Sequence, residues 1–413
     1  MTEETITLEL TTMANGGSAL GRHDERTIFV PYTIPGEIIE ARIIREKGRV
    51  AFAEGVKFID ASADRVFPQC PHFGPSRCGR CQWQHIDYQA QLLLKQDVLA
   101  DQLSRIGGFD DADVLPVIPA PEQWAYNYHM TFEFDENGIP GFLSSDGKSI
   151  CPMEECHILH SDLLELFNTL DMDFTGLQRL QLHIGSDGQH MLTLYVDDEE
   201  NAPQLDTDMT TSINMILPDN TPVNLIGDSH IRHKIGGHRL RVTAGSYFRA
   251  NIAQLDALAS LVIKLLDVNE ESSVLDLYAG VGLFSAYLAQ EVGLVTLVES
   301  YPPAATDADE NLADFDNVDV IEGTVEAVLA AVDENMKYDA VIVDPPPTGL
   351  STDAVDLLAE IAIPRIVYIS SDPATLARDA KRLTQKGYSL GKIQPIDLSP
   401  QTYYVDSIAL LEK

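Results

Sequence analysis

Hydrophobic and polar residues alternate with a period of two along residues 5–60, in segments such as ITLEL and EIIEARIIR. This period places successive side chains on opposite faces of a β-strand. Turn-forming residues interrupt the alternation at Asn15-Gly16-Gly17, Pro35-Gly36 and Lys47-Gly48. The alternation and its turns predict a small antiparallel β-barrel at this end of the chain.

The pattern changes further along the chain. Residues 82–107 carry apolar residues at helical spacing, which predicts a helix there, and residues 110–235 mix short strands with turns. A second helix is predicted at Ala253–Leu266. After it, the strand-like segments SVLDLYA, LVTLVES, VDVIEG, YDAVIVD and PRIVYIS alternate with helical stretches. This alternation predicts a doubly wound, mostly parallel sheet.

The chain is therefore expected to be an α/β protein with three domains. We expect a barrel at residues 1–62, a mixed α+β central domain at 63–240 and a doubly wound Rossmann-like domain at 241–413. A length of 413 residues, 45% of them hydrophobic, is sufficient for several cores.

No apolar run is long enough to span a membrane. The first ten residues, MTEETITLEL, lack the basic start and apolar block of a secretory signal. These features predict a soluble cytoplasmic protein with no membrane partner.

The formal net charge of −36 is unusual for a protein that binds nucleic acid, because such proteins normally present a basic surface to phosphates. A locally basic face is still compatible with an acidic chain, and the most basic stretch is IEARIIREKGR at residues 39–49. Two explanations of the acidity remain open: a salt-rich cytoplasm, or the loss of contact with nucleic acid.

Residues 274–285, VLDLYAGVGLFS, predict a buried strand, a glycine-containing turn and a helix. Gly280 and Gly282 allow a ligand to approach the backbone closely. The next strand ends at Glu299, where a carboxylate can accept hydrogen bonds from ribose hydroxyls. The turn departs from the G-x-G-x-x-G pattern, and Glu299 alone is equally compatible with a solvated strand end. Together with Asp276 these residues favour a nucleotide-like ligand at the carboxyl ends of the strands.

Asp344-Pro345-Pro346 follows the strand YDAVIVD and lies over the same expected crevice. The prolines hold the chain rigid at a strand end, so a simple strand terminator is one interpretation. The sequence also resembles the motif that nucleic-acid and amide-nitrogen methyltransferases present to their target. The turn, the acidic strand end and this motif together favour S-adenosylmethionine over NAD.

Five segments occur in the order found in RNA uracil-C5 methyltransferases. They are SYFRAN (246–251), DLYAGVGLFS (276–285), VDPPPTGL (343–350), ISSDPATLARD (369–379) and IDLSPQTYYVDSIALL (396–411). The chain thus resembles this family over nearly its whole length, and its barrel looks like the TRAM domain of many members. The resemblance implies an rRNA or tRNA substrate and S-adenosylmethionine held by Arg249, Asp276, Tyr278, Gly280, Gly282, Glu299 and Asp344.

Cys70, Cys78 and Cys81 form a C-x7-C-x2-C motif, and Cys156 lies further along. Clustered cysteines in a cytosolic protein favour a metal site over disulfides, so a [4Fe–4S] cluster, zinc and unliganded thiols are the alternatives. The four positions resemble the iron–sulfur site of the family, although the family spacing is usually C-x5-C. The fifth cysteine, Cys151, is expected to fill space in the core.

The family reaction needs a thiolate that adds to C6 of uracil and a base that removes the C5 proton. The position of the nucleophile is Ser371 here, and the position of the usual glutamate base is Asp406. With Asp344 these are the residues expected on the reaction side. Further replacements in the family pattern are Asn127, Ser144-Ser145, Arg249, Pro347 and Tyr404.

Three hypotheses follow from these replacements. The first is an S-adenosylmethionine-dependent RNA methyltransferase with an altered reaction centre. The second is a catalytically impaired RNA-binding or assembly factor that keeps the cofactor pocket. The third is an iron–sulfur or redox-responsive protein with a vestigial core, which the retained glycine turn, Glu299 and Asp344-Pro345-Pro346 argue against.

Overall fold

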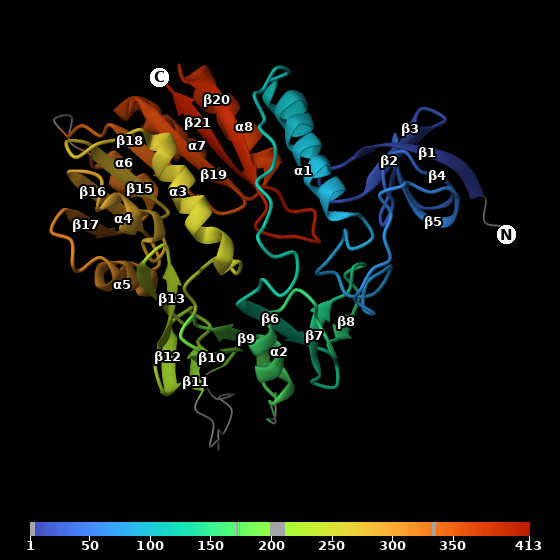
Figure 1. Ribbon diagram of the computed structural model, residues 1–413, viewed down its shortest axis with the longest axis horizontal. Coiled ribbons are helices and arrows are strands. Elements are labelled where there is room, and N and C mark those ends of the chain that lie inside the picture. Colours follow the sequence, from blue (N-terminus) through green and yellow to red (C-terminus); the bar gives the residue numbers. More distant parts are fainter. Residues whose placement is uncertain (1–4, 171, 173, 199–210, 333–335) are drawn as a thin grey trace.

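The computed structural model describes residues 5–170, 172, 174–198, 211–332 and 336–413. A five-stranded closed barrel lies at one end of the molecule (Figure 1). Its strands are β1 (Thr5–Met13), β2 (Ala19–His23), β3 (Arg26–Val30), β4 (Ile38–Lys47) and β5 (Val50–Asp60). The barrel was predicted as antiparallel throughout, but β3 runs parallel to β5. A ring of five strands cannot alternate direction at every pairing, so one parallel pair is required.

The helix predicted for residues 82–107 begins later than expected. It comprises α1 (Tyr88–Gln102) and a π-helical turn, η1 (Leu103–Gly107). Residues 82–87 form a bend and a turn instead, and Trp83 inserts into the barrel core, where its Nε1 donates a hydrogen bond to the Gly17 carbonyl at 3.1 Å. Asp87 then caps the helix by accepting a hydrogen bond from the Gln89 amide at 3.0 Å.

The central region is built on a seven-stranded sheet, ordered β12-β11-β10-β9-β6-β7-β8. Its elements are β6 (His129–Phe134), β7 (Pro140–Leu143), β8 (Ile150–Pro152), α2 (Ser161–Asn168), β9 (Leu177–Ile184), β10 (His190–Val196), β11 (Ser212–Ile216) and β12 (Pro222–Ile226). A separate hairpin, β13 (His230–Ile235) and β14 (His238–Thr243), leads from this sheet into the C-terminal part.

The C-terminal part is a doubly wound sheet, ordered β17-β16-β15-β18-β19-β21-β20. Its strands are β15 (Ser273–Leu277), β16 (Leu294–Glu299), β17 (Val318–Glu322), β18 (Ala340–Val343), β19 (Arg365–Ser370), β20 (Ser389–Ile396) and β21 (Asp406–Glu412). The first five are parallel, as predicted, and β21 is antiparallel to both of its neighbours. The α/β fold class is therefore confirmed.

Helices cover both faces of this sheet. They are η3 (Ile252–Gln254), α3 (Leu255–Leu266), α4 (Leu283–Leu288), α5 (Pro302–Asn311), α6 (Val325–Ala330), α7 (Thr352–Ile361) and α8 (Pro373–Gln385). One core contains buried residues of α3, α4 and α5, and the other contains those of α6, α7 and α8 together with α1. Since β15 to β19 are parallel, their carboxyl ends form one edge of the sheet, at which a ligand can bind.

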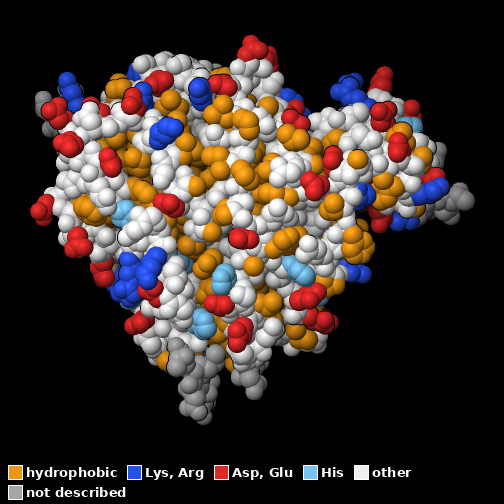
Figure 2. All heavy atoms as spheres, viewed as in Figure 1, with side chains coloured by type: hydrophobic (Ala, Val, Ile, Leu, Met, Phe, Trp, Pro, Cys, Tyr) orange, Lys and Arg blue, Asp and Glu red, His pale blue; other side chains and the backbone are white. Residues whose placement is uncertain are grey.

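The visible surface carries scattered Asp and Glu side chains, while Lys and Arg gather in small groups (Figure 2). Within the described ranges no helix is both long enough and apolar enough to cross a membrane.

A buried ion pair joins α1 to the loop between β20 and β21. Lys95 Nζ lies 2.7 Å from Asp397 Oδ1 and donates a second hydrogen bond to the Ser399 carbonyl at 3.0 Å. The side chains of Lys95 and Asp397 are 1% and 0% exposed. Tyr88 on the same helix donates to Asp397 Oδ2 at 2.9 Å, so the carboxylate is hydrogen-bonded at both oxygens. This contact fixes the loop that leads into Asp406.

We predict that Lys95→Met lowers the free energy of unfolding by about 3–5 kcal/mol, because Asp397 would remain buried without its cation. Urea denaturation measures the change. The double variant Lys95→Met/Asp397→Asn should recover most of the loss. Lys386→Met is the matched control, since its pair with Asp356 is also 2.7 Å long but half-exposed, and it should cost less than about 1 kcal/mol. Equal losses in the two single variants would contradict the prediction.

Candidate active site

The glycine turn after β15 has the backbone conformation that a close ligand approach requires. Gly280 and Gly282 have φ angles of 57° and 86°. A Cβ on Gly280 would meet only the Tyr247 carbonyl, at 4.0 Å, so the space beside it is open. A Cβ on Gly282 would lie 3.0 Å from Leu312, so glycine is needed there for packing. Tyr278 also has a positive φ, 59°, which turns the chain sharply at the strand end.

Asp276 is buried below this turn and connects it to α4. Its Oδ2 accepts a hydrogen bond of 2.7 Å from Ser285 on α4, and its Oδ1 is buried without a partner among the described residues. Burial raises the pKa of Asp276 to about 7. The structure therefore places Asp276 beneath the turn, where it links β15 to α4.

Glu299 lies at the carboxyl end of β16, beside the turn. One carboxylate oxygen accepts a hydrogen bond from the Gly280 amide at 2.9 Å, and the other accepts one from the Tyr301 amide at 2.7 Å. Each oxygen keeps a further lone pair. Glu299 is partly exposed, so these lone pairs remain available to hydroxyl groups of a ligand.

Arg249 and Asp344 face each other across the same edge of the sheet. Arg249 Nη2 lies 2.7 Å from Asp344 Oδ1, and the two side chains are only 10% and 18% exposed. Burial raises the pKa of Asp344, while the Arg249 guanidinium opposes that rise. Tyr247, two residues earlier, is an exposed aromatic ring within 3.4 Å of Arg249, and the sequence reasoning had not singled it out.

Asp406 begins β21 and is buried near this pair. Burial raises its pKa to about 6, and the charges of Arg249 and Lys95 limit the rise. A carboxyl group with such a pKa exchanges a proton near neutral pH, which suits a general base. Arg249 therefore acts electrostatically on both carboxylates of the predicted reaction side.

Ser371 lies between β19 and α8 and is partly buried. Among the described residues, no hydrogen bond to the Ser371 hydroxyl is found. The adjacent Ser370 has a structural role instead, since its Oγ donates to the Asp372 carbonyl at 2.9 Å and accepts from the Asp372 amide at 3.1 Å.

The DPATLARD segment at the start of α8 binds the loop that follows Asp344. Buried Asp379 accepts hydrogen bonds from the Leu350 amide at 2.8 Å and from the Tyr368 hydroxyl at 2.9 Å. Arg378 donates to the Thr348 carbonyl at 2.8 Å. The motif thus connects the two loops that border the site, a role that its sequence did not reveal.

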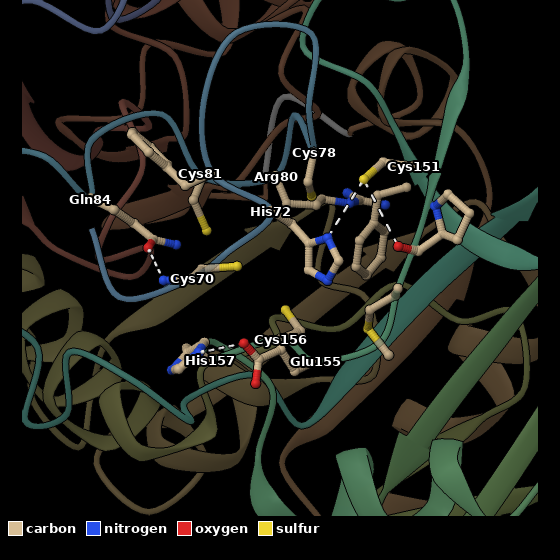
Figure 3. A pocket seen from close by; sticks show the side chains of 14 residues that line it. Cys70, His72, Cys78, Arg80, Cys81, Gln84, Cys151, Glu155, Cys156 and His157 are labelled. Atoms are coloured by element: carbon tan, nitrogen blue, oxygen red, sulfur yellow. Dashed lines mark hydrogen bonds and ion pairs between the residues drawn. The ribbon is translucent and has the colours of Figure 1, made fainter. Parts of the chain in front are cut away.

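All five cysteines line one pocket in the linker and central region, which we call the sulfur pocket (Figure 3). The sulfur atoms of Cys70, Cys78, Cys81 and Cys156 point toward a common space. Burial raises the pKa of Cys78 to about 11 and that of Cys156 to about 12, so in the absence of a cation these thiols stay protonated.

Cys151 does not fill the core as expected. It is half-buried on β8, lines the same pocket, and its Sγ lies 3.9 Å from His72 Nδ1. The longer loop between Cys70 and Cys78 carries His72 to this place. Among the described residues, no group of three or more His, Cys, Asp or Glu side chains is arranged to hold a single metal ion.

Comparison with known proteins places these features in a family. Residues 233–413 match the family model described as tRNA (Uracil-5-)-methyltransferase, and residues 1–56 match the TRAM domain. An uncharacterized RNA methyltransferase of Gloeobacter violaceus is 32% identical, over 99% of this chain and 97% of its own. Another from Aquifex aeolicus is 31% identical, over 100% and 99% of the two chains.

A solved structure has the same fold. The tRNA (uracil-54, C5)-methyltransferase of Pyrococcus abyssi, in complex with S-adenosyl-L-homocysteine, matches with a TM-score of 0.71 and 24% identity. The match covers 98% of this chain and 100% of that one. The TRAM domain precedes the methyltransferase domain along this chain, and the whole chain resembles known RNA methyltransferases. This protein therefore belongs to the RNA uracil-C5 methyltransferase family.

Proposed function

We propose that this protein is an S-adenosylmethionine-dependent RNA methyltransferase whose reaction centre has departed from the family's covalent route. The proposal rests on two groups of residues that lie close together. The open glycine turn and Glu299 lie at the same sheet edge as the Arg249–Asp344 pair. A ligand at the turn would therefore be next to the groups that meet a target base.

The residues present suit S-adenosylmethionine, which supplies a methyl group on a sulfonium when bound. Glu299 offers acceptors for ribose hydroxyls, and Gly280 leaves space for the ligand against the backbone. Tyr278, Gly282 and Asp276 shape the turn, while Arg249 and Asp344 border its outer side. The bound S-adenosyl-L-homocysteine of the Pyrococcus abyssi relative supports this assignment.

RNA is the proposed partner, and a large cleft between the barrel, the central region and the C-terminal loop supports it. Four cations line this cleft, Arg45, Arg65, Arg80 and Lys148, together with three carboxylates, Glu54, Glu133 and Asp146. Arg45 lies over the ring of Phe52 at 4.2 Å, and Arg65 lies over Phe58 at 4.1 Å. Guanidinium groups and aromatic rings can contact phosphates and stacked bases.

We propose that the protein departs from the family reaction at Ser371, the position of the nucleophile. Addition to C6 of uracil needs a strong nucleophile, and a serine without a base is a poor one. Every cysteine of the chain lines the sulfur pocket instead. A non-catalytic RNA-binding or assembly factor is the second candidate, and it is favoured by the Arg249–Asp344 pair, which occupies Asp344.

We predict that the protein binds S-adenosyl-L-homocysteine in a calorimetric titration. Glu299→Gln should weaken binding about tenfold, because a charged acceptor for hydroxyl groups is lost. Glu322→Gln is the matched control, since Glu322 pairs with Glu299 at the end of the neighbouring strand and is exposed. An absence of wild-type binding at millimolar ligand would refute the cofactor assignment, and an equal effect of both variants would make Glu299 an ordinary solvated carboxylate.

We predict that the wild-type protein forms no stable adduct with 5-fluorouridine RNA, and that Ser371→Cys gains 5-methyluridine formation, more so when combined with Asp406→Glu. Transfer of a tritiated methyl group to total RNA measures the gain. Ser370→Cys is the control, because it adds a thiol one residue away at a buried position. A trapped adduct with the wild-type protein would contradict the altered route. RNA binding without methyl transfer in any variant would support the assembly factor.

We also propose that the sulfur pocket holds a [4Fe–4S] cluster on Cys70, Cys78, Cys81 and Cys156, supported by their convergence in one pocket. The prediction is about four iron and four sulfide per chain after anaerobic purification, with absorption in the blue. Cys156→Ser should remove the iron, and Cys151→Ser should retain it. One zinc per chain, or no metal, would overturn the assignment.

A further inference from the structure

Three histidines lie together in the central region, two of them fully buried and His129 partly buried. His129 on β6 is the cross-strand partner of His183 on β9, and their ring centroids are 4.8 Å apart. His183 Nε2 lies 3.0 Å from Nε2 of His233 on β13. His183 and His233 are 3% and 0% exposed. Residues 50 to 104 positions apart in sequence thus lie together at one site, which we call the histidine trio.

The trio contacts Phe248 through both its backbone and its ring. His129 Nε2 donates a hydrogen bond of 2.8 Å to the Phe248 carbonyl, and because a carbonyl only accepts, this nitrogen carries a proton. The ring of His233 stacks on the ring of Phe248 with centroids 5.3 Å apart and an interplanar angle of 7°. Phe248 is therefore held on two sides.

The residues that follow Phe248 are also held by hydrogen bonds. The Tyr128 amide donates to the Ala250 carbonyl at 3.0 Å, and Asn251 Nδ2 donates to the Leu398 carbonyl at 3.1 Å. Arg249 lies between Phe248 and Ala250, and its guanidinium reaches Asp344 at 2.7 Å. The position of the guanidinium thus depends on how residues 248–251 lie against the central sheet.

The trio is held in its neutral form. Burial lowers the pKa of His233 to about 3, and it also lowers the pKa values of His129 and His183. The neighbouring histidines lower the pKa values of His183 and His233 further, whereas the hydrogen bond to the Phe248 carbonyl opposes the lowering of the pKa of His129. The bordering titratable groups are Tyr128, 6.2 Å from His233, and His160, which packs on the far side of Tyr128. Neutral rings keep the N–H···O and N···N contacts intact.

We propose that His129, His183 and His233 are positioning residues of the active site, which hold residues 248–251 so that Arg249 stays against Asp344. This inference rests on the proposed function only where it concerns cofactor binding. The geometric part, the dependence of the Arg249–Asp344 pair on the trio, stands by itself.

The test compares two replacements of His129. His129→Phe keeps a ring but loses the donor to Phe248, whereas His129→Gln restores an N–H donor. The first readout is the dissociation constant of S-adenosyl-L-homocysteine, and the second is the Nε–Hε NMR signal of Arg249, identified by its loss in Arg249→Lys. We expect His129→Phe to weaken binding about fivefold and to shift the Arg249 signal, as the loss of one hydrogen bond would. His129→Gln should return both toward the wild-type values.

His85→Phe is the matched control, because His85 is also buried and its Nε2 also lies near a backbone carbonyl, that of Thr33 at 3.5 Å. It should lower the melting temperature about as much as His129→Phe while leaving the Arg249 signal unchanged. If His129→Phe does not fold, His233→Phe, which keeps the stack but loses the bond to His183, should give the same shift.

The two proposals fail separately. If the wild-type protein does not bind S-adenosyl-L-homocysteine, the proposed function fails while the Arg249 signal still decides the role of the trio. An unshifted Arg249 signal in folded His129→Phe, or an equal shift in His85→Phe, would overturn the positioning role.

Discussion

The buried pair of Lys95 and Asp397 is the contact on which the arrangement of the three regions depends. Lys95 is on α1, which lies between the barrel and the C-terminal sheet (Figure 1). Two charges removed from water are stable only with full hydrogen bonding, and here Tyr88 and the Ser399 amide complete it. The loop after Asp397 also receives hydrogen bonds at its carbonyls from Gln82, Trp83 and Tyr126. One loop thereby connects the barrel linker, the central region and the strand that begins with Asp406.

Local patterns in the sequence were sufficient for the features that depend on neighbouring residues. The glycine turn, the strand-end Glu299 and the parallel sheet follow from short-range periodicity, and the structure places them as expected. Features made by distant residues could not be predicted in this way. Lys95 and Asp397 are 302 positions apart, and the histidine trio draws on three strands. The late start of α1 has the same origin, because Trp83 packs in the barrel core, which is formed by residues far away in sequence.

The reaction side was predicted from resemblance, and the structure adds the electrostatics that resemblance lacks. Asp344 and Asp406 are both buried, and two buried carboxylates oppose each other's ionisation. Arg249 acts on both, which makes the ionised forms less costly. A neutral side chain at this position would not supply that charge.

The replacement at Arg249 therefore has a physical meaning beyond the loss of a family residue. A guanidinium that is 10% exposed is costly to bury unless it is paired, and Asp344 pairs with it at 2.7 Å. The centre thus combines two carboxylates and one cation where the family uses a thiolate and a glutamate. Such a centre can hold or accept a proton near neutral pH, because burial raises the pKa of Asp406 to about 6. We propose that base chemistry keeps a candidate residue in Asp406, whereas the nucleophilic addition of the family reaction has no cysteine at its position, Ser371.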